Sequence, residues 1–290
     1  MRRIFMINLE VFFNGVILGS LYGLMSGGYS LIYGVGKVSN LAYGHMYITS
    51  TFLAYMLYKE FQSLLVVVPV VLFLTFLLGV ATQYLLERVS EDHSRVLFLS
   101  LGIAIILENL LLAYFGGIYR FSPRYISGLI EFAGIRLDIY RVIIFAVTIS
   151  LYILMSLLVT RTQFGTEMRA VSQNEDASWL MGINVQKVKL VTGGLAAGLA
   201  GVAAILLLPI YPIYPAMGWE YLLVGFAIVI VGGLGSLNGT LIAGVILGAA
   251  ESLFGYYVSS GLRGVFYFTI VVLVLLVRPQ GILGKKRGYK

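Results

Sequence analysis

The chain has 290 residues, of which 59% are hydrophobic and only 11% are charged, and its mean hydropathy is +0.94. Soluble domains contain roughly 45–50% apolar and about 25% charged residues, so a soluble enzyme, a disordered chain and a coiled coil are excluded. The formal net charge is +7, which is typical of membrane proteins with basic cytoplasmic loops. The composition therefore predicts an all-α, multi-pass integral protein of the cell membrane.

A transmembrane helix needs ~20 mostly apolar residues, and nine segments of the chain approach that length. They lie at about 11–34, 41–58, 64–86, 96–118, 140–159, 189–209, 221–235, 238–258 and 264–278. One of the two segments between 11 and 58 could be re-entrant instead of spanning. We therefore predict a polytopic transmembrane helical bundle of eight or nine spans, forming a single domain over residues 1–290.

Two glycine-rich joints separate neighbouring apolar segments, one at residues 33–40 and the other at 232–239. We expect helix breaks and close packing at their glycines, which are Gly34, Gly36, Gly232, Gly233, Gly235 and Gly239. The likeness of the two joints indicates either a weak internal repeat or chance. Glycine pairs spaced by four residues, such as Gly15 with Gly19 and Gly244 with Gly248, also predict close helix packing.

Three polar stretches connect the apolar segments, at 87–95, 119–139 and 160–188. If the basic C-terminal cluster at 285–290 lies inside the cell, counting spans backwards makes 160–188 cytoplasmic and 119–139 extracytoplasmic. Within 160–188, residues 166–181 predict a short helix along the membrane surface, with Thr166 as its cap. A structured loop of this length is large enough to dock a partner protein.

Polar side chains inside the apolar segments are candidates for the translocation pathway, because a charge within the bilayer is costly. Glu108 and Glu251 could couple protons or contact a substrate ammonium group. They could equally be structural residues, hydrogen-bonded to Asn109 and Ser252. Asn40 and His45 flank the first joint, and a structural role is open for them as well.

The sequence contains no Walker A pattern, no His-Glu-x-x-His and no Gly-x-Ser-x-Gly. There is no cysteine, so thiol catalysis is excluded, and only two histidines disfavour a multi-histidine metal centre. We therefore expect no enzyme activity, no cofactor and no resident metal, and any ATP hydrolysis would take place on another chain.

Four stretches, in order along the chain, carry a further pattern: Asn14–Tyr47, Phe164–Asn184, Gly232–Gly244 and Arg278–Gly284. Together they resemble the LivH-type permeases of branched-chain amino acid ABC transporters, from about residue 11 to 284. The sequence departs from the family at Tyr43, where histidine is usual, and at His45, where an acid is common. Related permeases carry amides or urea, so those substrates remain an alternative.

The resemblance implies a permease subunit of the cell (inner) membrane that forms half of a translocation pathway and works by alternating access. Its implied partners are a second homologous permease, two ATP-binding subunits at the cytoplasmic face and an extracytoplasmic substrate-binding protein, which loop 119–139 could dock. The ATPase-coupling residues would be Phe164, Gly165, Met168, Arg169, Ala170, Asn174, Ala177, Gly182, Ile183 and Asn184. The pathway candidates become Asn40, Tyr43, His45, Glu108 and Glu251.

Functions of other classes stay open at this point. An ion- or proton-coupled secondary transporter would use Glu108 and Glu251 as coupling sites, but it gives the 164–184 segment no task. An intramembrane enzyme would need a paired catalytic set at membrane depth, and no motif joins the two acids. A scaffold without transport activity leaves the glycine joints and the membrane acids unexplained.

Overall fold

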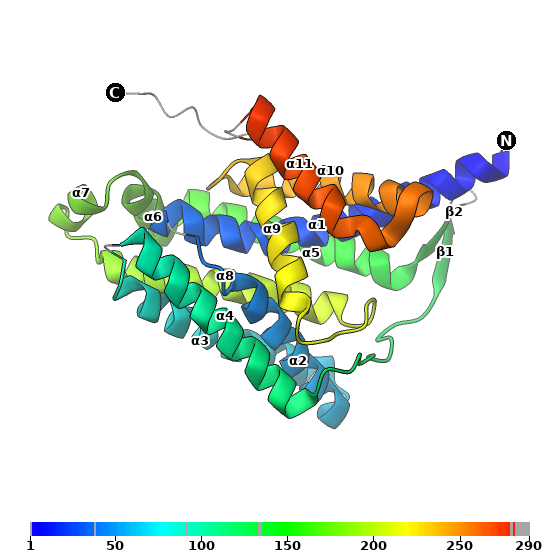
Figure 1. The fold of residues 1–290 in the computed structure, drawn as a ribbon, viewed down its shortest axis with the longest axis horizontal. Coiled ribbons are helices and arrows are strands. Elements are labelled where there is room, and N and C mark those ends of the chain that lie inside the picture. The colour runs from blue at the N-terminus through cyan, green and yellow to red at the C-terminus, as the bar shows by residue number, and fades with distance from the viewer. Residues whose placement is uncertain (1, 38, 91, 133–134, 279–280, 282–290) are drawn as a thin grey trace. The chain divides into compact units, whose positions relative to one another are not determined.

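The computed structural model describes residues 2–37, 39–90, 92–132, 135–278 and 281, with side chains described from Asn8 onward except at 131–137 (Figure 1). The basic cluster at 285–290, which we placed inside the cell, lies outside these residues. The elements are α1 (Arg2–Gly36), α2 (Tyr43–Phe61), α3 (Leu64–Glu87), α4 (His93–Phe115), β1 (Leu129–Phe132), β2 (Ile135–Asp138), α5 (Ile139–Arg161), α6 (Gln163–Gln173), α7 (Glu175–Leu180), α8 (Val185–Leu207), α9 (Met217–Gly232), α10 (Leu237–Phe254) and α11 (Arg263–Val277).

Within the described residues, six helical stretches are long and apolar enough to cross a membrane. They are Asn8–Gly36, Leu64–Glu87, His93–Phe115, Ile139–Arg161, Val185–Leu207 and Leu237–Val277. The last stretch joins α10 to α11 through a π turn at Gly255–Ser259 and a 3₁₀ turn, where we expected two separate spans. Helix α2 carries several polar residues, and α9 has only 16 residues. The protein is therefore a multi-pass helical membrane protein, and eight or nine spans remain a prediction.

The chain folds as two compact units. The first unit comprises residues 1–27, 123–154 and 223–290, and the second comprises 28–122 and 155–222. Helix α1 contributes its first part to one unit and its last part to the other. Each unit gathers segments that are distant in sequence, so each has its own long-range packing.

In the first unit, α1 and α10 cross with their backbones in contact. A Cβ atom added to Gly15 would lie 2.7 Å from the carbonyl oxygen of Gly248, and one added to Gly244 would lie 2.6 Å from the Cα of Gly23. This confirms the packing role predicted for these glycine pairs. Gly232 and Gly239 approach each other in the same way, and positive φ angles at Gly233 (99°) and Gly235 (80°) form the joint between α9 and α10.

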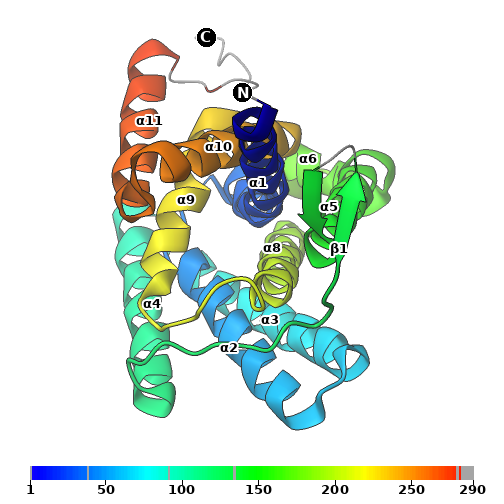
Figure 2. The ribbon, with the colours of Figure 1, turned by 90° about the vertical axis from the view of Figure 1, so that its right-hand side faces the viewer.

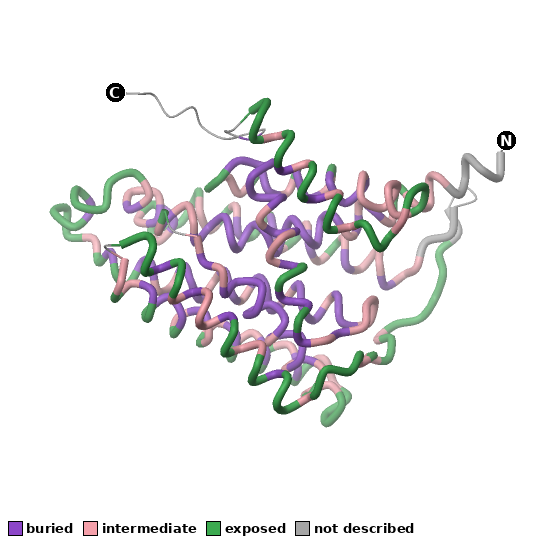
Figure 3. Tube along the Cα trace, in the orientation of Figure 1, coloured by how far each residue is buried: buried purple, intermediate pink, exposed green. Residues whose placement is uncertain are grey.

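In the second unit, α8 is the central helix, and Figures 1 and 2 both show it beside α2 and α3. Its backbone meets α3 at glycine, because a Cβ on Gly193 would lie 2.7 Å from the Cβ of Gln83. Most of α8 is buried, whereas α4 buries only a narrow stripe at Val96, Ser100, Ala104 and Leu111 (Figure 3). The remaining face of α4 is apolar and exposed, as expected of a surface that meets lipid or another membrane chain.

The predicted loops are more helical than the sequence suggested. Helix α5 continues to Arg161 and α8 begins at Val185, so most of 160–188 is helix. The single helix that we predicted at 166–181 is two helices, broken at Asn174. Thr166 is not its cap: Thr162 caps α6 by accepting a hydrogen bond from the Gly165 amide at 3.0 Å. Loop 119–139 contains the antiparallel hairpin of β1 and β2.

Candidate functional site

Glu108 meets two aromatic side chains from other helices of the second unit. Its Oε2 atom accepts a hydrogen bond from the indole Nε1–H of Trp219 at 2.8 Å. The Nε2 atom of His45 lies 3.4 Å from the same oxygen. The rings of His45 and Trp219 pack edge to face with centroids 4.5 Å apart. We call these three residues the Glu108 cluster.

The backbone makes room for this cluster through two glycines. Gly218 immediately precedes Trp219, and a Cβ on Gly218 would lie 2.8 Å from the Cδ2 and Nε2 atoms of the His45 ring. Gly44 immediately precedes His45, and a Cβ there would lie 2.8 Å from the Cβ of Leu222. The start of α9 therefore packs directly on the start of α2, which brings an indole and an imidazole to one carboxyl group.

Exposure differs among the members of the cluster. The His45 side chain is fully buried, with 0% of its surface exposed, whereas 17% of the Glu108 side chain is exposed. His45 Nδ1 has no hydrogen-bond partner within the described part of the chain. The carboxyl group of Glu108 is thus held on one oxygen by the indole and remains reachable from outside the unit, as a ligand-binding group needs to be.

Two of the predicted pathway residues serve the local fold. The Asn40 side chain accepts a hydrogen bond from the Ala42 amide at 2.9 Å, which shapes the turn before α2. The Tyr43 hydroxyl donates to the Ala196 carbonyl oxygen at 3.1 Å, and its ring packs on Tyr29 with centroids 5.5 Å apart. Both residues are buried, and neither contacts the Glu108 cluster in any described hydrogen bond, ion pair or ring contact.

Glu251 is paired in the first unit, on the helical hairpin between α10 and α11. Its Oε1 atom lies 2.5 Å from Nε of Arg263, and its Oε2 atom accepts a hydrogen bond from the Tyr267 hydroxyl at 2.6 Å. The Arg263 guanidinium also lies over the Tyr22 ring, 5.0 Å from its centroid. Both oxygens of Glu251 are therefore occupied, and the pair closes the hairpin across the π turn.

The companions that we predicted for the two acids are wrong. Asn109 donates to the carbonyl oxygen of Ile105 on the exposed face of α4. Ser252 donates to the carbonyl oxygen of Val11. Adjacent residues on a helix point about 100° apart, so the partners of both acids come from other segments of the chain.

The predicted coupling residues form the sharp turns of the segment α5–α6–α7–α8. A Cβ on Gly165 would lie 2.6 Å from the Val159 carbonyl carbon, and the Arg169 guanidinium donates to the Val159 oxygen. Met168 is buried, and Phe164 and Ala170 are partly buried. These contacts fold α6 back against the end of α5.

The second half of the segment is shaped by its caps. Asn174 caps α7 by accepting from the Ala177 amide at 3.0 Å, and Asn184 caps α8 by accepting from the Lys187 amide at 2.9 Å. Between them Gly182 has a φ of 84°, and the Ile183 amide donates to the Ser178 carbonyl oxygen at 3.0 Å. The sequence pattern at 164–184 thus specifies backbone geometry, and the large exposed apolar side chains beside it come from other residues.

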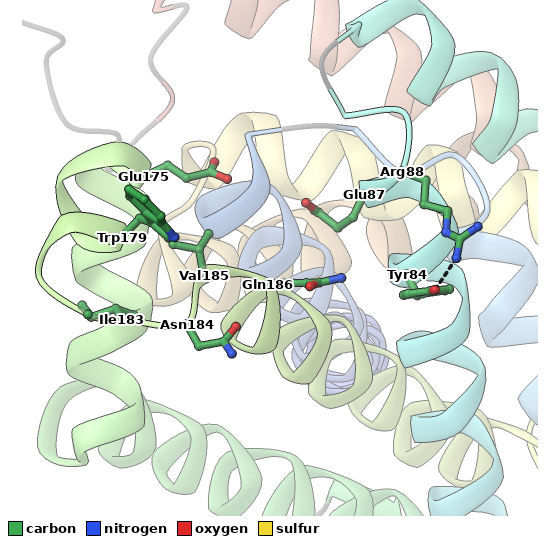
Figure 4. Close-up of a pocket in the computed structure, with 10 residues that line it drawn as sticks. Tyr84, Glu87, Arg88, Glu175, Trp179, Ile183, Asn184, Val185 and Gln186 are labelled. Carbon is green, nitrogen blue, oxygen red and sulfur yellow. Dashed lines mark hydrogen bonds between the residues drawn. The ribbon is translucent and has the colours of Figure 1, made fainter.

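That surface is apolar and lies beside a pocket. Trp179, Leu180 and Met181 at the end of α7 are 70%, 76% and 83% exposed. An open pocket of about 760 Å³ is lined by residues of α3, α7 and the start of α8, among them Tyr84, Glu87, Glu175 and Gln186 (Figure 4). We call Trp179, Leu180 and Met181 the apolar tip, and exposure of this kind marks a contact surface for protein or membrane.

Sequence reasoning missed Trp219, Arg263 and Lys189. Lys189 lies in an apolar helix, so the rule that flagged the two acids could also have found it. Nothing in the sequence pairs Trp219 with Glu108, which are 111 positions apart. Among the described residues, no group of three or more His, Asp or Glu could hold a metal ion.

Comparison with known proteins identifies the family. Residues 11–277 match the model of the branched-chain amino acid transport system permease component. The chain belongs to this family.

The permease is similar over nearly its full length to named members of the family. It is 29% identical to the high-affinity branched-chain amino acid transport system permease protein LivH of Escherichia coli (strain K12), over 98% of each chain. It is 28% identical to BraD of Pseudomonas aeruginosa over 96% of each chain. It is 31% identical to a probable LivH of Methanocaldococcus jannaschii over 93% of this chain and 90% of that one. No solved structure is a significant match.

The pairing of Glu251 with Arg263 predicts a non-additive effect on stability. Glu251→Gln or Arg263→Met alone leaves one charged group without its partner, so each lowers the free energy of unfolding by about 1–3 kcal/mol. The double variant removes both charges and loses less than the sum of the two. Thermal unfolding of the purified permease in detergent measures this.

The exposed pair of Asp92 and Arg95 is the matched control, because its side chains are 48% and 74% exposed. Asp92→Asn and Arg95→Gln should each change stability by less than about 0.5 kcal/mol. Additive losses at Glu251 and Arg263 would show that the two residues do not act as a pair.

Proposed function

We propose that the permease is the transmembrane subunit of an ABC importer for branched-chain amino acids. The observation that carries this proposal is similarity over almost the whole chain to relatives named as branched-chain amino acid permeases. The absence of a Walker A pattern from the sequence agrees with it, since ATP hydrolysis then belongs to separate subunits. Membership of an ABC transport system implies ABC partners.

The proposed assembly contains a second homologous permease, two ATP-binding subunits and an extracytoplasmic substrate-binding protein. The α6–α7 segment would receive the ATP-binding subunits at the cytoplasmic face. Its support is structural: α6 is folded tightly on α5, and α7 presents the exposed apolar tip. An aromatic residue flanked by aliphatic ones is the composition favoured at the centre of protein interfaces.

The mechanism we propose is alternating access. Closure of the ATP-binding subunits favours one conformation of the permease pair, and their release favours the other, because they bind the two conformations with different free energies. Release of substrate by the binding protein loads the outward-facing conformation. The permease itself needs only a pathway with a few polar groups, since the binding protein carries out most of the recognition.

Within that pathway, we assign the Glu108 cluster to contact with the ammonium group of the amino acid. A carboxyl group held by an indole N–H is already oriented, so it loses little conformational entropy on binding a cation. The aromatic rings beside it can add a cation–π attraction. Glu251 has both oxygens occupied, and we assign it to the stability of the α10–α11 hairpin.

Gly165 tests the coupling segment. Gly165→Leu places a side chain against the carbonyl groups of Leu158 and Val159, which displaces α6. We expect co-purification of the ATP-binding subunits to fall by about tenfold or more, on the scale of a lost interface hot spot. Affinity purification of the tagged permease from gently solubilised membranes, with the bound proteins identified, measures the loss.

Gln163→Leu adds the same side chain to an exposed position of the same helix and should retain the partners. A Gly165→Leu permease that retains its ATP-binding subunits and its uptake would refute the assignment of α6 to the docking site. Wild-type permease that purifies without any ATP-binding protein would refute the ABC assembly itself.

Glu108 tests the pathway. Glu108→Ala removes the carboxyl group, and we expect kcat/KM for leucine uptake to fall by about tenfold or more, from loss of one charge-assisted interaction of ~1.5–3 kcal/mol. Asn109→Ala is the matched control on the exposed face of the same helix and should keep wild-type uptake. Initial rates in vesicles containing equal amounts of complex provide the measurement, and equal kcat/KM for Glu108→Ala and wild type would remove Glu108 from the pathway.

A further inference from the structure

A buried lysine joins three helices of the second unit by contacting two glutamates that line the pocket. Lys189 of α8 is 5% exposed. Its Nζ atom lies 2.6 Å from Oε1 of Glu175 on α7 and 3.1 Å from Oε2 of Glu87 at the end of α3. In Figure 4 the carboxyl groups of Glu87 and Glu175 are directed toward each other from opposite sides of the pocket. We call these three residues the Lys189 clamp.

The position of Lys189 is costly for α8 by itself. A buried ammonium group loses its hydration, and near the N-terminal end of a helix a positive charge gains nothing from the helix dipole. Valine or leucine would suit this buried position better. The contacts with the two carboxyl groups therefore offset the cost of burying Lys189. This indicates that the residue serves to connect helices.

The two helices on one side of the clamp are packed rigidly. Gly79 and Gly193 bring the backbones of α3 and α8 into contact, and Phe76 packs on Gly194 in the same interface. Glu87 is held a second time, because its Oε1 atom accepts a hydrogen bond from the Gln83 side chain at 2.9 Å. Helices α3 and α8 thus share one continuous packed interface.

The element on the other side of the Lys189 clamp, α7, is short. Helix α7 has six residues, far fewer than an isolated helix needs to be stable in water. Only Ser178 of α7 is buried, and the tip beyond it is exposed. Among the described salt bridges, the one between Glu175 and Lys189 is the one that connects α7 to another element.

We propose that the Lys189 clamp transmits displacement of α7 to α3 and α8, with Lys189 as a positioning residue. This inference rests on the proposed function, because it takes α7 as the element that the ATP-binding subunits move. An ammonium group is a point charge with three rotatable donors, so it can shift between Glu175 and Glu87 as α7 moves. A displacement of α7 is then transmitted to α3 and α8, which pack against each other.

The test compares two neighbouring acids of α7 in the assembled complex. Glu175→Gln removes the charge that faces Lys189, and Asp176→Asn removes the same charge from an exposed residue one position later. We expect Glu175→Gln to lower the number of leucine molecules transported per ATP by roughly fivefold to tenfold, a typical size for coupling between sites. Asp176→Asn should remain within about twofold of wild type, and both variants should retain their ATP-binding subunits.

Lys189→Met provides the second variant, because a buried side chain cannot act by contacting the partner directly. It should reproduce the loss seen for Glu175→Gln, and the double variant Glu175→Gln/Lys189→Met should be no worse than either single one. Lys189→Arg keeps the charge and should restore part of the coupling. Equal loss in Asp176→Asn, or additive losses in the double variant, would overturn the proposal.

A readout on the permease alone separates this proposal from the proposed function. Hydrogen exchange of backbone amides at 174–184 needs no substrate and no partner, and we expect it to be faster in Glu175→Gln than in Asp176→Asn. Unchanged exchange would overturn the clamp even if leucine transport is confirmed. Exchange that is faster in Glu175→Gln, together with a wild-type complex that does not transport leucine, would support the clamp and count against the substrate assignment.

Discussion

Pairing of buried and partly buried charged side chains is the constraint on which the arrangement of this permease depends. An ionised group that is taken out of water loses its hydration, so each such group needs a partner in the protein. The structure meets this requirement three times: Glu108 with Trp219 and His45, Glu251 with Arg263 and Tyr267, and Lys189 with Glu87 and Glu175. In each case the partners come from different segments, so each pairing also fixes how helices pack.

The three clusters differ in how fully the charge is satisfied, and this difference is the basis for the separate roles that we propose. Glu251 has a partner on both oxygens and closes a helical hairpin. Glu108 is held on one oxygen and stays partly exposed, which leaves it able to contact a solute. Lys189 is shared by two carboxyl groups, which suits a connection whose geometry changes during transport.

Much of the fold could be predicted from the sequence, because apolar length and glycine spacing follow directly from the physics of helices in lipid. Six apolar helical stretches and the contact of Gly15 and Gly19 with Gly244 and Gly248 were accessible in this way. The first joint was not, because α1 continues through Gly34 and ends at Gly36, where a Cβ atom would meet no backbone closely. The family could be identified for a related reason: its pattern at 164–184 contains residues such as Gly165 and Asn174, which shape the turns of the segment locally.

The partners of the buried charges could not be predicted. A hydrogen bond such as that between Trp219 and Glu108 joins positions 111 residues apart, and it depends on how two helices cross. Adjacency in the sequence predicts Asn109 and Ser252 as the partners of the two acids instead, although neighbouring residues on a helix face different directions. The cap of α6 was misplaced from Thr162 to Thr166 because both threonines precede a helical pattern, and only the backbone geometry decides between them.

The energy source for transport distinguishes an ABC importer from a transporter driven by an ion gradient. Vesicles that contain the permease with its co-purified partners would be loaded with either ATP or a non-hydrolysable analogue, and supplied with binding protein and labelled leucine. We expect uptake that requires hydrolysable ATP and persists when ionophores abolish the proton and ion gradients. Uptake by the permease alone, driven by an imposed gradient without ATP, would contradict it and would make Glu108 an ion-coupling residue.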